Sequence, residues 1–79
     1  MIGVYGYSVR LIQLNQRADQ KRLGVRLGKA CIKRGLSVRD VSLTLRVSRQ
    51  TVYNWFVGKT APQKLVEPQV FKLLASLNK

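Results

Sequence analysis

Two helix-start signals, Ser37 and Ser48, lie so close together that they constrain the fold more than any other feature. A serine oxygen at such a position accepts a hydrogen bond from the unpaired N–H groups of a first helical turn. Apolar residues recur at helical spacings around the two serines, namely Val38, Val41, Leu45, Val47, Val52 and Trp55. Only Arg46 and Val47 separate the first apolar run from the second serine. Two short helices joined so tightly cross at a steep angle, which predicts a helix-turn-helix.

The second helix of this pair, expected near 49–57, carries polar side chains that a core does not need. These residues are Arg49, Gln50, Tyr53 and Asn54. Arg suits guanine, and Gln or Asn suits adenine, in two-pronged hydrogen bonds to base edges. This face therefore indicates a recognition helix for DNA. The first helix is expected near 38–45, with Ser42 as the small residue at the crossing.

The charge of the chain favours a polyanionic partner. Lys and Arg total 15 against 3 acidic residues, which gives a formal net charge of +12. Nucleic acid is the first candidate, an anionic membrane surface is the second, and a merely solvated basic surface is the alternative. One group of cations either keeps a solvated face soluble or extends the phosphate contacts, and the sequence leaves both open: Lys21, Arg22, Arg26, Lys29 and Lys33.

The residue types exclude most catalytic chemistry. The chain has no His and a single cysteine, Cys31, so a Cys–His nucleophile, a His-bearing zinc site and an internal disulfide are excluded. Nothing in the sequence pairs its three carboxylates. No apolar run approaches the roughly 20 residues that span a bilayer, and no signal peptide is recognisable. We expect no enzyme, cofactor, metal, membrane or small-molecule substrate, and a cytoplasmic protein in which Cys31 is a buried apolar residue.

The N-terminal residues 1–16 differ from the rest and are expected to form an arm or a short strand. An imperfect period-two pattern over 9–14 favours the strand, and a helix starting at Ser8 remains open. Such a strand could pair with its copy in a second subunit or fold over the domain's own core.

Residues 17–79 are expected to form one all-α domain, so that the chain is a compact bundle of four or five helices. The first firm helix is expected at 17–34, with Gly35 at its end. Gly24 and Gly28 lie on one side of it, where another backbone could approach closely. Gly58 is expected to end the recognition helix in a left-handed conformation, and a last helix should start at Glu67-Pro68 and carry the apolar residues Val70, Leu73, Leu74 and Leu77.

The segment from Val47 to Thr60 resembles the helix-turn-helix of phage repressors and Cro proteins, the lambda-repressor-like or XRE-type family. It reads Val-Ser-Arg-Gln-Thr-Val-Tyr-Asn-Trp-Phe-Val-Gly-Lys-Thr, and the resemblance extends from about Leu27 to Asn78. It implies a phage-type transcriptional regulator that binds double-stranded DNA. The residues that it implies for base reading are Arg49, Gln50, Tyr53 and Asn54. Those that it implies for phosphate contact, with Arg39 as a substitute from the neighbouring position, are Arg39, Ser48, Thr51, Lys59, Thr60 and Lys64.

The chain departs from the family pattern at three places. Val38 stands where the family usually has a phosphate-bonded Gln, and Arg46 stands where its tight turn often has Gly. A non-glycine residue rarely adopts a positive φ, which leaves open another geometry for this turn. Cys31 and Phe56 occupy the positions of a partly buried Arg–Glu pair. Because both partners are apolar here, no buried charge is left unpaired, and the joint change supports the alignment.

One such module reads only a few base pairs, so a homodimer on a two-fold symmetric operator is expected. Residues 4–14 or the last helix would supply the dimer surface. Two alternatives stay open. One is an interaction protein whose helix-turn-helix core binds RNA polymerase or another regulator, and the other is a nonspecific nucleic-acid binder, for which Arg49, Gln50 and Asn54 would be replaceable.

Overall fold

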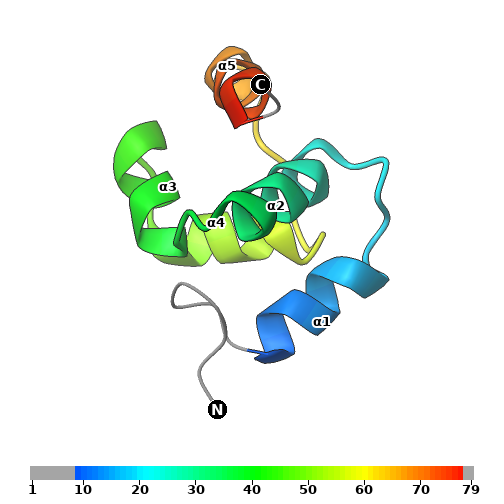
Figure 1. Cartoon of the computed structure of the whole chain (residues 1–79). Helices are drawn as coiled ribbons and strands as arrows, with labels where there is room; N and C mark the ends of the chain where they lie inside the picture. The colour runs from blue at the N-terminus through cyan, green and yellow to red at the C-terminus, as the bar shows by residue number, and fades with distance from the viewer. Residues whose placement is uncertain (1–8, 78–79) are drawn as a thin grey trace.

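The computed structural model describes residues 9–77, which form five helices and contain no strand (Figure 1). The helices are α1 (Val9–Arg17), α2 (Leu23–Arg34), α3 (Val38–Leu45), α4 (Arg49–Phe56) and α5 (Glu67–Leu77). The prediction of a compact all-α fold is confirmed. No helix among these residues is both long enough and apolar enough to cross a membrane.

The α3–α4 pair starts where the two serines predict. The Ser37 Oγ accepts from the Asp40 N–H at 3.0 Å, and the Asp40 Oδ2 accepts from the Ser37 N–H at 3.3 Å. This reciprocal arrangement satisfies two otherwise unpaired donors. The Ser48 Oγ accepts from the Thr51 N–H at 3.1 Å. The predicted helices near 38–45 and 49–57 are confirmed, with Phe56 as the last residue of α4.

The turn between α3 and α4 keeps a left-handed residue although it has no glycine. Arg46 has a φ of 58° and a ψ of 43°, and its N–H donates to the Ser42 carbonyl at the end of α3. A left-handed conformation costs a non-glycine residue roughly 1–2 kcal/mol. The other geometry that the sequence left open for this turn does not occur.

The strand expected over 9–14 is wrong, because these residues belong to α1, and the helix that the sequence left open is the alternative that forms. Leu11 and Asn15 lie one helical turn apart and are both buried, with 3% and 2% of their surface exposed. The Asn15 Nδ2 donates to the Phe56 carbonyl at 2.7 Å and to the Val25 carbonyl at 3.2 Å. A strand would also point Leu11 and Asn15 to one side, but about 13 Å apart along the chain, whereas one helical turn brings them within about 6 Å of each other. The rest of the predicted arm, residues 1–8, lies outside the described residues.

The first firm helix starts later than predicted. Arg17 ends α1, and 18–22 form a turn in which the Asp19 Oδ1 accepts from the Lys21 N–H at 2.9 Å. The predicted start at residue 17 is therefore wrong, because this turn reverses the chain before α2 begins at Leu23. The predicted ends are confirmed, since Gly35 and Gly58 follow α2 and α4 with φ values of 79° and 80°.

Two glycines let α2 cross α4 at close range. A Cβ on Gly24 would stand 2.7 Å from the Trp55 Cβ, and a Cβ on Gly28 would stand 2.7 Å from the Phe56 Cγ. Neither distance leaves room for a side chain, so the expected close approach of another backbone is confirmed. In Figure 1, α2 lies in front of α4, with α1 below the pair and α5 above it.

The core fills the space between this helix pair and α5. Val70, Leu74 and Leu77 are buried, as their spacing predicts, and Leu73 is half-buried. Cys31 and Phe56 have no exposed surface, which agrees with an apolar replacement of a charged pair. Helix α4 packs mainly against α2 and α3, and its remaining surface stays outside the core.

Candidate nucleic-acid interface

Helix α4 has an apolar side that is buried and a polar side that is not. Val52, Trp55 and Phe56 have at most 4% of their surface exposed. Arg49 and Gln50 are exposed at the first helical turn. The buried residues set the rotation of the helix, so the polar residues are presented by packing on the opposite side.

The other two predicted base-reading residues are half-buried. Tyr53 packs against the core cluster and keeps part of its surface in solvent. The Gln50 Nε2 donates to the Asn54 Oδ1 at 3.0 Å, which joins two side chains one turn apart. This bond leaves the Gln50 carbonyl oxygen and the Asn54 amide N–H groups free to accept and donate. An acceptor beside a donor complements the N6 and N7 groups of adenine in the major groove.

The start of α4 is polar and positively charged. The Ser48 Oγ and the Thr51 Oγ1 are 2.8 Å apart, in addition to the cap bond to the Thr51 N–H. The first turn has no acidic residue, and Arg49 occupies its first position. The partial positive charge of a helix N-terminus adds to that cation. This end of α4 is therefore suited to a phosphate group.

The loop after α4 is held to the helix by its backbone. The N–H groups of Lys59 and Thr60 donate to the Asn54 carbonyl at 2.9 and 3.3 Å. Both side chains are exposed. Thr60 and Thr51 also line one surface hollow of about 330 Å³ beside Trp55. The predicted residues Ser48, Thr51, Lys59 and Thr60 thus lie at the two ends of α4 and along one side of it.

Arg39 and Lys64 lie on other elements. Arg39 is exposed in the first turn of α3, and Lys64 is exposed in the turn that precedes α5. Among residues 9–77, neither side chain bonds to the polar residues of α4. Their link to the α4 surface is that one precedes α4 in the chain and the other follows it.

Cys31 offers no reactive group. Burial raises the pKa of its thiol from 9.0 to about 12, so the thiol keeps its proton at neutral pH. It is a core residue, as predicted. Within the described part of the chain, no three His, Cys, Asp or Glu residues come together as metal ligands.

Asn15 supports the site without being part of it, and the sequence pattern did not predict it. Its side chain satisfies the Phe56 carbonyl at the C-terminal end of α4, where intrahelical partners run out. The signal for it in the sequence is its position four residues after Leu11, which places an amide in line with an apolar helical face.

Comparison with known proteins places the same segment in a family. Residues 27–66 match the family model HTH_3, described as helix-turn-helix. The match covers 40 of the 79 residues and includes α3, α4 and the loop that follows. No curated protein and no solved structure matches the chain.

Proposed function

The chain belongs to the helix-turn-helix family HTH_3, a family of DNA-binding regulators, and on this basis we propose that it is a sequence-specific, phage-type repressor or Cro-like protein. In this proposal α4 enters the major groove, and Arg49, Gln50, Tyr53 and Asn54 read base edges. The family is not typically enzymatic.

The observation that carries the proposal is the division of α4 into two sides. Trp55 and Phe56 face α2, and the Gln50–Asn54 pair lies about half a turn away from them. Side chains that no core contact requires are thus held in a defined geometry at the surface. A surface that served only nonspecific binding would need cations but no amide pair of fixed orientation.

Phosphate contacts would hold α4 in register. We assign them to residues at the ends of α4 and on its neighbours: Arg39, Ser48, Thr51, Lys59, Thr60 and Lys64. Cations, hydroxyl groups and backbone N–H groups at such positions bind phosphate oxygens and carry no sequence information. The exposure of Arg39, Lys59 and Lys64 supports this assignment.

A homodimer would place two copies of α4 about one helical turn of DNA apart, roughly 34–36 Å. We assign the dimer surface to α5, because Phe71 on this helix is 50% exposed although it is a large apolar residue. Two-fold pairing of the protein predicts a palindromic site, because each half-site is then read by the same residues.

The test is selection of binding sites from random DNA duplexes at moderate salt. The variant Arg49→Ala/Gln50→Ala removes one Arg and one Gln from α4. A matched control, Arg10→Ala/Gln13→Ala, removes the same residue types from exposed positions on α1. We expect a palindromic consensus for the wild type and the control, and none for the α4 variant.

Three results would contradict parts of the proposal. A wild-type protein that enriches no sequence is not a sequence-specific binder. An α4 variant that keeps the consensus does not read DNA through Arg49 and Gln50. A consensus without two-fold symmetry argues against the homodimer.

A further inference from the structure

A second group of cations lies on the side of α2 that points away from α4. Gly24 and Gly28 press against Trp55 and Phe56, so they mark the side of α2 that faces α4. Arg26 follows Gly24 by two positions, which places it about 200° round the helix. Lys29 and Lys33 lie within roughly 60° of Arg26 by the same geometry, and all three are exposed.

This side of α2 and the reading side of α4 face opposite directions. The Gln50–Asn54 pair lies on the far side of α4 from α2, and Arg26 lies on the far side of α2 from α4. Packed helix axes are about 8–10 Å apart. Two helix diameters therefore separate the two surfaces, in a molecule whose extents are 35 × 25 × 21 Å. A duplex held against α4 lies out of reach of these cations.

We propose that this surface binds the phosphate backbone of a second DNA duplex, so that one molecule bridges two DNA segments. The α2 basic surface consists of Arg26, Lys29 and Lys33, all exposed. The proposal goes beyond reading by α4, because the second contact is independent of base sequence.

The cations form a line that suits an extended polyanion. They follow one another at spacings of three and four residues, which spreads them over about 10 Å of helix. A duplex offers a phosphate every ~3.4 Å along each strand, so several phosphates fit along such a line. A single small anion would use only one or two of these groups.

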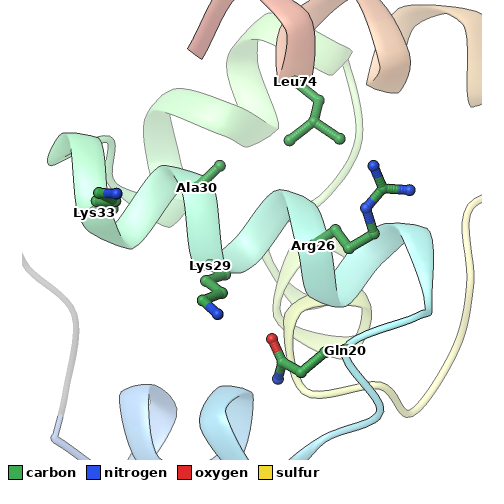
Figure 2. A pocket seen from close by; sticks show the side chains of 6 residues that line it. All are labelled: Gln20, Arg26, Lys29, Ala30, Lys33 and Leu74. Carbon is green, nitrogen blue, oxygen red and sulfur yellow. The ribbon is translucent and has the colours of Figure 1, made fainter. Parts of the chain in front are cut away.

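The surface beside this line is open and lacks an acidic partner. Figure 2 shows Arg26, Lys29 and Lys33 around a hollow of about 310 Å³ that Gln20, Ala30 and Leu74 also line. The three carboxylates of the chain are used elsewhere or lie elsewhere: Asp19 bonds to the Lys21 N–H, Asp40 belongs to the cap of α3, and Glu67 is in the first turn of α5. Within residues 9–77, none of them forms an ion pair with the α2 basic surface.

An acidic protein segment fits this surface less well. Protein partners bind mainly through apolar or aromatic anchors in desolvated pockets. The hollow offers only Ala30 and the edge of Leu74, which is itself 5% exposed. Charge without an anchor favours nucleic acid, whose affinity comes from phosphate contacts.

The test uses a three-residue variant, Arg26→Gln/Lys29→Gln/Lys33→Gln. Arg22 is kept, because its Cδ lies near the α4–loop junction at Gly58. Gln has nearly the helix propensity of Lys and Arg, so α2 should stay folded, as circular dichroism will show. The control Arg10→Gln/Arg17→Gln/Lys72→Gln removes the same charge from exposed positions on α1 and α5.

Bridging is measured with one random-sequence duplex fixed to beads and a second, fluorescent duplex in solution. We expect wild type and control to capture the second duplex at low salt, and the α2 variant to capture about tenfold less or lower. The log–log salt slope of capture should fall by about 0.9 for each phosphate that the variant no longer neutralises. In site selection from random DNA, the α2 variant should still enrich the wild-type consensus.

Two results would overturn the proposal. One is an absence of bridging by the wild type. The other is bridging by the α2 variant as strong as that of the control, and weaker retention of this variant on immobilised poly-glutamate would then assign the surface to an acidic protein segment. Bridging is measured on random-sequence DNA, so its outcome does not depend on whether site selection finds a consensus operator.

Discussion

In the tight turn between α3 and α4, a single residue, Arg46, adopts the unfavourable left-handed backbone conformation. Within residues 9–77 it is the only residue other than glycine with a positive φ, 58°. The bond from its N–H to the Ser42 carbonyl ends α3 and sets the direction in which α4 starts. The long cationic side chain is exposed at the turn.

Replacing Arg46 by Gly should therefore stabilise the fold. The variant Arg46→Gly removes the left-handed strain but gives the unfolded chain more freedom, which leaves a net gain of up to about 1 kcal/mol in the free energy of unfolding. Urea denaturation measures it. Arg46→Ala removes the same side chain and keeps the strain, so Gly should exceed Ala. A Gly variant less stable than the Ala variant would contradict this account.

The polar side of α4 was predictable because its signals are local. A serine cap, an apolar spacing and a polar remainder place Arg49, Gln50 and Asn54 on the side of α4 opposite its apolar residues, from the sequence of that helix alone. Asn15 was not predictable in this way, because its partners Val25 and Phe56 are 10 and 41 residues away. An amide without those carbonyls looks like an ordinary polar residue of a loop or strand edge.

At the scale of elements, the crossing of α2 over α4 depends on two missing side chains. The variant Gly28→Ala would normally stabilise a helix by about 1 kcal/mol. Here the added Cβ would stand 2.7 Å from both the Phe56 Cγ and the Asn15 Nδ2. Overpacking of this kind costs about 1–3 kcal/mol, so we expect a net loss of stability in thermal or urea unfolding.

Lys29→Ala is the matched change for this prediction. It lies next to Gly28, is exposed, and should alter the free energy of unfolding by no more than about 0.5 kcal/mol. If Gly28→Ala proved as stable as Lys29→Ala or more so, α2 and α4 would not pack as closely as their glycine contact requires.

The same contrast explains which elements the sequence predicted well. The bounds of α3 and the starts of α4 and α5 agree with the predictions, because Ser37, Ser48 and Pro68 mark them locally. The prediction failed for α1 and for the start of α2. There the boundary depends on a turn at 18–22 and on burial against other helices, and neither leaves a strong pattern in the sequence.

At the scale of the whole molecule, the burial of Cys31 makes the free energy of unfolding depend on pH in the alkaline range. Its thiol has a pKa of about 12 in the folded protein against 9.0 ordinarily, because burial disfavours the thiolate. The unfolded chain therefore loses this proton first as pH rises. The stability associated with the protonated thiol is complete below pH 9 and declines from there towards pH 12, at up to about 1.4 kcal/mol per pH unit.

The measurement compares urea unfolding of wild type and Cys31→Ala at pH 8 and pH 10.5, with a reductant present. Loss of the sulfur leaves a small cavity whose cost does not depend on pH. The wild type should thus lose more stability than Cys31→Ala between the two pH values. Equal losses would mean that the thiol is as accessible in the folded state as in the unfolded one.

The bond from Asn15 to the Phe56 carbonyl also bears on the order in which the chain folds. The bond closes a loop of 41 residues, whereas the α3–α4 turn is closed by neighbours a few positions apart. Long loops lose more chain entropy on closure, and local contacts form first. The Phe56 carbonyl reaches the position in which it accepts this bond only after α4 has formed and packed against α2. The contact of α1 with the end of α4 is therefore expected to form after the α3–α4 turn.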